Sequence, residues 1–275
     1  MILQVMIGIS NMNNIADDIN WVQTGRGQSE TVVLVHAIGQ DLTYWDRQIE
    51  CLASTYNVVA FDLPGHGRSR GIPQEWSFEM STATVAKLIE CVSALPVHLV
   101  GISFGGMIAQ RLTIERPELV RSLTLIATAP RFSDEVRLEM RRRAETVREQ
   151  GMSAILESTI SRWFTADTRS RRPDIIDRIT KTLLNDNPDI HAAIWDLISG
   201  HDTHTSLGRI QCPTIVMVGN QDPSTPPWVA EELASAIPGA KMIVIPNASH
   251  IVTVEAPGAV NEALKHFLKS LQGSA

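Results

Sequence analysis

Cysteine is scarce in this 275-residue chain, and no CxxC pair occurs in it. The three cysteines, Cys51, Cys91 and Cys212, are odd in number and far apart. This excludes a disulfide framework and offers no zinc-binding pattern. We therefore expect free thiols in a reducing compartment, and a cytoplasmic protein.

An excess of positive charge is also lacking. The chain has 24 Lys and Arg residues against 30 Asp and Glu, a formal net charge of −6, so it lacks the basic face that neutralises nucleic-acid phosphates. No segment has the length of a membrane helix. Residues 1–11 are apolar without preceding basic residues, so we interpret them as an extension of uncertain order or an upstream start choice, and not as a secretory signal. We expect no nucleic-acid partner and no membrane association.

Short apolar segments alternate along the chain with amphipathic helical segments. Runs such as TVVLVHA and NVVAFD are rich in valine and bounded by turn signals, which is typical of strands buried on both faces of a parallel sheet. Helices are predicted between them, listed here by position: 43–54, 78–93, 104–116, 227–236 and 257–271. This alternation predicts βαβ units and a single α/β fold with a mostly parallel central sheet flanked by helices.

One long segment interrupts this alternation. Residues 131–206 are rich in charges of both signs and contain no strand-like run. We predict that they form a helical lid, inserted after the sixth strand of the sheet. Residues 1–130 and 207–275 would then form the α/β core.

The strongest local signal is GISFG, residues 101–105, which matches the pattern G-x-S-x-G. It directly follows the strand VHLV and opens the helix FGGMIAQRLTIER, so Ser103 would lie on a sharp strand-to-helix turn with an exposed hydroxyl. Gly101 and Gly105 lack the Cβ atoms that would clash in such a turn. This setting predicts a nucleophile elbow; the alternative is a Gly/Ser turn that merely connects the two elements.

A serine hydroxyl needs a base before it becomes a good nucleophile. Asp222 follows the strand PTIVMVG, and His250 follows the strand KMIVIP. Catalytic groups collect at such carboxyl strand ends, and the order Ser, acid, His is the one expected after a nucleophile elbow. We predict Ser103 as nucleophile, His250 as general base and Asp222 as the acid that orients it. Taken singly, Asp222 is also explained as a turn residue before proline, and His250 as a capping residue.

Acyl transfer also requires donors for a developing oxyanion. The backbone N–H of Phe104 is one predicted donor, since it follows the nucleophile and lies at the positive end of a helix. The other is the N–H of Ile38, in the loop HAIGQ after the first central strand.

Five segments, VHAIG, FDLPGHGRS, GISFGGMIAQ, GNQDPSTPP and IPNASH, have the order and spacing found in α/β hydrolases. The resemblance covers nearly all of residues 13–271. It is strongest to the branch of 3-oxoadipate enol-lactonases and small carboxylesterases, through HAIGQDLTYWDRQ, GGMIAQ and SRWFTADTR. The resemblance implies a serine hydrolase of the α/β-hydrolase fold that cleaves a small ester or lactone. It implies no cofactor and no metal, and a monomer or homodimer. We expect a mostly apolar pocket between lid and sheet, which favours an apolar or weakly acidic substrate.

The chain departs from that branch at two places. Ala37 follows His36 where many members have glycine, which restricts the oxyanion loop. Leu63 and Pro64 occupy a turn in which the lactonases often have an arginine. If that arginine serves the substrate carboxylate, ring-opening of this particular enol-lactone is in doubt.

Three further residues, His36, Trp163 and Trp195, are candidates for the substrate pocket. The two tryptophans are explained equally well as the small core of the lid. For His66, in PGHGRS, we favour a structural role over catalysis.

Two charged or metal-like patterns have plain explanations. The two histidines of HDTH, residues 201–204, have no third ligand nearby in the sequence, so we do not predict a zinc site. The run Arg141–Arg143 is interpreted as the solvated face of a helix; the alternative is a salt bridge to an anionic substrate.

Two other functions remain open. Hydrolysis of carbon–carbon bonds in ring-cleavage products uses the same triad, although those enzymes commonly carry Asn where Ile102 stands here. A hydrolase-like binding protein that keeps the triad and turns over slowly is the second.

Overall fold

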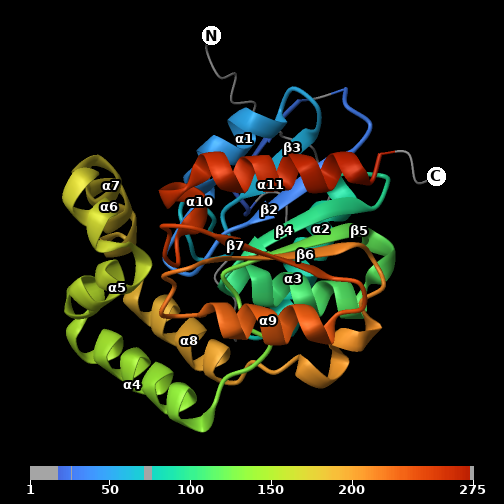
Figure 1. The fold of residues 1–275 in the computed structure, drawn as a ribbon. Coiled ribbons are helices and arrows are strands. Elements are labelled where there is room, and N and C mark those ends of the chain that lie inside the picture. Colours follow the sequence, from blue (N-terminus) through green and yellow to red (C-terminus); the bar gives the residue numbers. More distant parts are fainter. Residues whose placement is uncertain (1–17, 26, 71–75, 273–275) are drawn as a thin grey trace.

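Figure 1 shows a computed structural model of the chain, in which residues 18–25, 27–70 and 76–272 are described. Residues 1–11, interpreted above as an extension, lie outside the described residues. Within those described, a seven-stranded sheet forms the centre of the molecule, in the order β1-β3-β2-β4-β5-β6-β7. β1 runs antiparallel to β3, and all other neighbouring strands are parallel. The predicted fold class is confirmed.

The strands are β1 (Trp21–Thr24), β2 (Thr31–Val35), β3 (Asn57–Phe61), β4 (Val97–Ile102), β5 (Val120–Ile126), β6 (Thr214–Gly219) and β7 (Lys241–Ile245). The helices of the core are α1 (Asp46–Leu52), α2 (Phe78–Val92), α3 (Phe104–Glu115), α9 (Pro227–Ala236), α10 (Val252–Glu255) and α11 (Pro257–Ser270). The helices between β5 and β6 are α4 (Asp134–Gln150), α5 (Leu156–Trp163), α6 (Ala166–Arg171), α7 (Pro173–Leu184) and α8 (Pro188–Ser199). Of the helices in the described part of the chain, none is long and apolar enough to cross a membrane.

The central strands are buried on both faces, which explains their continuous apolar sequences. In β2, Val32 and Leu34 belong to the apolar cluster on one face of the sheet, and Val33 and Val35 to the cluster on the other. Helices α1 and α11 cover the first face, while α2, α3 and α9 cover the second (Figure 1). The sheet is therefore a rigid platform whose strand ends can hold side chains in fixed positions.

The predicted helices are present with small changes at their ends. Helix α2 begins at Phe78 because the Ser77 side chain accepts a hydrogen bond from the N–H of Met80, an N-cap. The helix predicted over 43–54 is divided into a 3-10 turn, Leu42–Trp45, and α1.

Helices α4 to α8 form an insertion that lies beside the core (Figure 1). It leaves and rejoins the core at one point, where Arg131 pairs with Asp202 in an isolated antiparallel bridge and the Thr203 N–H donates to the Pro130 carbonyl at 2.9 Å. The predicted place of the insertion, after the sixth strand, needs correction. Among the described residues it follows the fifth strand, β5, because only β1 precedes β2 there.

A buried histidine near this junction limits stability in acid. The His201 ring is fully buried, 5.1 Å from the Phe78 ring, and neither of its nitrogens has a hydrogen-bond partner within the described ranges. Burial, with help from nearby Arg111 and Arg137, lowers the pKa of His201 to about 3. In an unfolded chain the pKa of histidine is about 6.5, so the unfolded state binds a proton that the folded state excludes. The free energy of unfolding must therefore fall as the pH drops from about 6.5 toward the folded pKa.

We predict that His201→Phe flattens this pH dependence, because phenylalanine fills the same space without a titrating group. The slope should decrease by up to about 1.4 kcal/mol per pH unit below about pH 6. Part of the slope should remain, since burial and neighbouring His66 also lower the pKa of His36 to about 3. Urea unfolding at neutral and mildly acidic pH measures the effect. An unchanged slope in the variant would show that His201 is not the responsible group.

Candidate active site

Ser103 lies on the turn between β4 and α3 in a strained backbone conformation, with φ 51° and ψ −117°. Non-glycine residues rarely adopt a positive φ, and they persist there only when their surroundings hold them. Here the Ser103 N–H donates to the Ile126 carbonyl of β5 at 2.9 Å, and the Ser103 carbonyl accepts from the Thr128 hydroxyl at 2.8 Å. Both bonds come from the neighbouring strand and its loop, so the sheet itself fixes the serine.

The two glycines of the turn are required by close approach. A Cβ atom on Gly101 would lie 2.4 Å from the Gly105 carbonyl oxygen, and one on Gly105 would lie 2.3 Å from the Val35 carbonyl oxygen. Neither contact can be relieved by rotating a side chain, because the opposing atoms are backbone. The glycines thus let α3 start directly against the end of β2.

The three residues predicted as a triad lie together, although 147 positions separate Ser103 from His250. His250 Nε2 is 3.0 Å from Ser103 Oγ, and His250 Nδ1 is 2.8 Å from Asp222 Oδ2. The Asp222 carboxylate can only accept a hydrogen bond, so the proton of the neutral imidazole belongs on Nδ1. The Nε2 lone pair is then free to accept the Ser103 proton.

The surroundings of Asp222 keep it ionised. Burial by itself raises the pKa of this carboxyl, but the neighbouring His250 and the hydroxyl and amide of Thr225 outweigh burial and hold the pKa below its usual value. One carboxylate oxygen accepts from the N–H groups of Ser224 and Thr225, at 2.8 and 3.1 Å. The other accepts from the Thr225 hydroxyl at 2.7 Å as well as from His250. The turn after Asp222 therefore both orients the carboxylate and stabilises its charge.

The loops that carry Asp222 and His250 are joined to each other. The Asn220 N–H donates to the Ile245 carbonyl and the Gln221 N–H to the Ala248 carbonyl, both at 2.9 Å. Since β6 and β7 are parallel neighbours, both loops emerge at the same edge of the sheet. This pairing sets the distance between the carboxylate and the imidazole.

Two backbone amides, those of Ile38 and Phe104, are the predicted oxyanion donors. Ile38 lines the same cavity as Ser103, and the Phe104 N–H is the first of α3. Neither amide donates to a hydrogen-bond acceptor among the described residues. Free N–H groups in this position can stabilise negative charge on a carbonyl oxygen attacked by Ser103.

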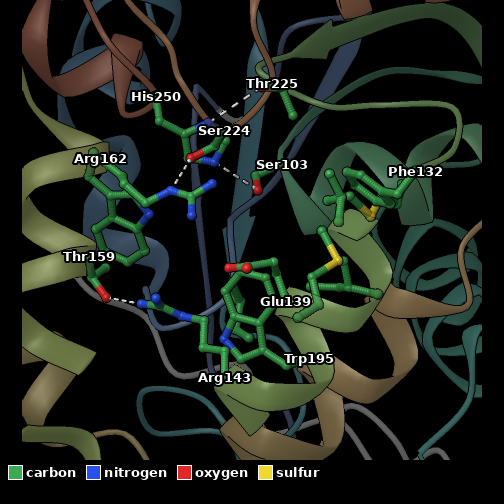
Figure 2. Close-up of a pocket in the computed structure, with 16 residues that line it drawn as sticks. Ser103, Phe132, Glu139, Arg143, Thr159, Arg162, Trp195, Ser224, Thr225 and His250 are labelled. Carbon is green, nitrogen blue, oxygen red and sulfur yellow. Dashed lines mark hydrogen bonds between the residues drawn. The ribbon is translucent and has the colours of Figure 1, made fainter. Parts of the chain in front are cut away.

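A cavity of about 140 Å³ opens in front of Ser103 (Figure 2). Its walls come from the ends of the core strands and from α4, α5 and α8 of the insertion. Trp163 and Trp195 are both in the wall. The residues lining it are Ile38, Ser103, Met107, Phe132, Val136, Glu139, Met140, Arg143, Thr159, Arg162, Trp163, Trp195, Ile198, Ser224, Thr225 and His250.

The prediction that His36 contributes to this cavity is wrong. Its ring is fully buried, and Nε2 accepts the Leu63 N–H at 2.9 Å while Nδ1 lies 2.7 Å from the Ala37 carbonyl. His66 is buried as well, with its ring 5.1 Å from that of His36 and its Nδ1 3.1 Å from the Pro64 carbonyl. Both histidines therefore hold the loops that follow β2 and β3.

The residues described by the structure contain no group of three His, Cys, Asp or Glu side chains that could hold a metal ion. Of the HDTH histidines, His201 is buried next to Phe78, and His204 Nδ1 lies 3.4 Å from a Glu232 carboxylate oxygen.

Known proteins resemble this chain in sequence and in fold. The profile of the alpha/beta hydrolase fold family matches residues 30–257. The chain belongs to this family. It is 28% identical over 251 residues to 3-oxoadipate enol-lactonase 2 of Acinetobacter baylyi, covering 91% of this chain and 93% of the relative. It is 33% identical over 231 residues to the pimeloyl-acyl-carrier-protein methyl ester esterase of Chromobacterium violaceum, covering 82% and 88%.

Among solved structures, this α/β hydrolase superposes on a thermophilic esterase from Thermogutta terrifontis with malate bound. The TM-score is 0.86 and the identity 31%, with 92% of this chain and 93% of the esterase covered. The resemblance to the enol-lactonase and esterase branch is confirmed.

The sequence reasoning missed the charges in the cavity. The run Arg141–Arg143 was interpreted as a solvated face, and this is wrong for Arg143, which is partly buried and lines the cavity. Arg162 and Glu139 line it too. Helical phase is the signal that distinguishes Arg143 from Arg141 and Arg142, since neighbouring residues of a helix point in different directions.

Glu255 was also missed, although it joins the insertion to the loop of His250. Its carboxylate accepts from the Thr165 N–H at 2.8 Å and the Thr165 hydroxyl at 2.7 Å on one oxygen. The other oxygen accepts from the Ser249 N–H at 2.5 Å. Because Ser249 precedes His250 and Thr165 caps α6, Glu255 ties the loop of the imidazole to the start of α6.

We predict that Glu255→Gln lowers the free energy of unfolding by about 1–3 kcal/mol. The NH₂ of the new amide would face a backbone N–H group, from which it cannot accept a hydrogen bond. A less firmly held His250 should also lower kcat more than it changes KM. Thermal unfolding and steady-state kinetics measure the two effects. Glu262→Gln, at an exposed position of α11, is the matched control and should change neither. A Glu255→Gln enzyme with normal stability and kcat would contradict the assigned role.

Proposed function

We propose that this α/β hydrolase cleaves a small carboxylic ester or lactone through an acyl-enzyme on Ser103. The observation that carries the proposal is the continuous hydrogen-bond chain from Asp222 through His250 to Ser103, which ends in a cavity. The family relationship and the names of its relatives, an enol-lactonase and two esterases, support the same bond type.

In the first half of the reaction, Ser103 Oγ attacks the carbonyl carbon while its proton moves to His250 Nε2. The Ile38 and Phe104 N–H groups stabilise the resulting oxyanion. The carbon–oxygen bond to the leaving alcohol then breaks, and His250 protonates the departing oxygen. In a lactone this oxygen stays attached to the acyl chain. Asp222 stabilises the transient imidazolium throughout.

In the second half, water takes the place of the alcohol. His250 removes a proton from the water as it attacks the acyl carbon, and the ester bond to Ser103 breaks. The proton returns to Ser103 Oγ, which regenerates the neutral triad and releases a carboxylic acid. Besides the substrate and this water, the steps use only the chain's own residues.

The helical insertion supplies the outer wall of the site. We propose that residues 131–206 act as a lid over a core formed by residues 1–130 and 207–275. The tryptophans Trp163 and Trp195 belong to this wall, so they would limit the size of the acyl group. A cavity of about 140 Å³ favours a small substrate.

We predict that Ser103→Ala and His250→Ala each reduce kcat by roughly 10⁴-fold or more, because both residues act in the same proton transfer. The double variant should be little slower than either single one. Hydrolysis of p-nitrophenyl acetate, measured together with circular dichroism to verify folding, tests this. Losses that add in the double variant would mean that the two residues work separately.

Labelling with a fluorophosphonate separates an enzyme from a slow-turnover binding protein. We predict rapid, stoichiometric labelling that disappears in Ser103→Ala, because only an activated serine reacts with this probe. Burst kinetics on p-nitrophenyl acetate should accompany it. Tight binding of small esters without turnover or labelling would instead favour the binding protein, and turnover of carbon–carbon substrates alone would favour that rival chemistry.

A further inference from the structure

Two arginines of the insertion enter the cavity from the same side, across from Phe132 (Figure 2). Arg143 comes from α4 and Arg162 from α5. Burial, followed by the nearby charge of Arg162, lowers the pKa of Arg143 to about 10, so its guanidinium remains charged at neutral pH. Arg162 is exposed, so the cost of burial falls on Arg143, whose half-buried charge is unfavourable unless a negative group accompanies it.

The contacts of Arg143 orient the guanidinium and leave part of it free. Its Nη1 donates to the Ser158 hydroxyl at 3.2 Å, and its Nη2 donates to the Thr159 hydroxyl. Both hydroxyls donate their own protons to the Ile155 carbonyl, so they can only accept from the arginine. The buried Nε–H has no partner among the described residues. The guanidinium is therefore held in place and keeps N–H groups that can donate to a ligand.

Neither cavity arginine has a carboxylate partner within 4.0 Å in the described part of the chain. Arg162 donates instead to the Ser224 hydroxyl at 3.4 Å. Other arginines of the same insertion are paired: Arg148 with Asp196, Arg171 with Asp167, Arg172 with Asp174 and Arg178 with Asp46. Arg141, Arg142 and Arg169 also lack an ion pair among the described residues, but they are exposed. Arg143 differs from them because its unpaired charge is half-buried in the cavity wall.

The Trp195 ring packs against the guanidinium of Arg143. The guanidinium carbon lies 5.2 Å from the centre of the Trp195 ring. The Trp195 indole N–H donates to His191 Nε2 at 3.0 Å, and His191 Nδ1 lies 2.7 Å from the Asp186 carboxylate. Since Nε2 accepts from the indole, the His191 proton is on Nδ1 and faces Asp186. This chain fixes the indole ring, and the ring in turn fixes the arginine.

Glu139 is the single acidic residue among those that line the cavity. It stands one helical turn before Arg143 on α4, and its carboxylate is not within ion-pair distance of either arginine. The cavity lining therefore keeps a net positive charge, which Glu139 reduces but does not neutralise.

From these observations we propose that Arg143 and Arg162 form a carboxylate-binding subsite, and that the substrate is an ester or lactone bearing a second, free carboxylate. The planar guanidinium matches a carboxylate through two parallel hydrogen bonds. Bound there, the free carboxylate anchors the far end of the substrate in the lid while Ser103 attacks the ester carbonyl in the core. The inference deepens the proposed function and rests on it for the bond that is cleaved.

Two p-nitrophenyl esters of equal chain length test the subsite. The monoester of glutaric acid has a free carboxylate, and p-nitrophenyl pentanoate ends in a methyl group. The wild-type kcat/KM should favour the glutarate monoester after subtraction of its uncatalysed hydrolysis. Arg143→Met removes the guanidinium and should lower the glutarate-to-pentanoate ratio by roughly 10–100-fold, as expected for hydrogen bonds to a charged group. Arg162→Met should lower the ratio in the same direction.

Two variants on α4 serve as controls. Arg142→Met changes the exposed neighbour of Arg143 and should leave the ratio as it is in the wild type. Glu139→Gln removes the opposing charge and should raise the ratio. If Arg143→Met does not fold, Arg143→Lys replaces it and should give a smaller loss, because lysine keeps the charge but not the planar fork. Equal losses on both esters, or no wild-type preference for the glutarate monoester, would overturn the subsite.

A binding measurement separates this inference from the proposed reaction. Ser103→Ala protein is titrated with monomethyl glutarate in a calorimeter, so that no turnover is needed. Binding that Arg143→Met weakens about tenfold or more supports the subsite even if ester hydrolysis fails. Absence of binding, together with Ser103-dependent hydrolysis of p-nitrophenyl pentanoate, would overturn the subsite and leave the proposed function standing.

Discussion

The imidazole of His250, held between a carboxylate and a hydroxyl, is the interaction on which the rest of the site depends. Asp222 fixes its tautomer and Ser103 presents a proton to its free nitrogen. An error of about 1 Å in this arrangement can cost about 10²-fold in rate. The position of each partner is set by a strand end: β4 for the serine, β6 for the aspartate and β7 for the histidine. A sheet buried on both faces is rigid enough to hold all three.

The strained backbone of Ser103 is held in place by hydrogen bonds from neighbouring residues. A positive φ at a serine costs free energy of order 1–3 kcal/mol, and bonds from Ile126 and Thr128 keep the residue there. The same turn exposes the hydroxyl and starts α3 at the amide of Phe104. One local distortion therefore provides both a nucleophile and a donor for the oxyanion.

Much of the fold and of the triad could be predicted from the sequence because the signals for them are local. The elbow is a pattern of five consecutive residues, and Asp222 and His250 each lie in the loop that follows an apolar strand, three and five positions after the strand ends. The parts that could not be predicted depend on partners distant in the sequence. Glu255 joins the loop of His250 to Thr165, which is 90 positions away, and His36 is a buried support because of Leu63, 27 positions away. Arg143 could not be told from Arg142 without knowing which side of α4 faces the core.

The core and the insertion have different roles in the site. In this account the core provides the reacting groups, and the insertion provides the charges and aromatic rings that choose the substrate. Changes in α4 and α5 could therefore alter specificity while the triad stays intact, in agreement with the general observation that function is varied on the elements that surround a stable scaffold.

The most direct test of the central claim is to trap the covalent intermediate. The enzyme is mixed with p-nitrophenyl acetate, quenched in acid within milliseconds, and digested for mass spectrometry. The account predicts one acetyl group on the peptide that contains Ser103, formed during the burst and lost at the rate of turnover. Turnover without an acetylated Ser103 peptide, or with the acetyl group on another residue, would contradict it.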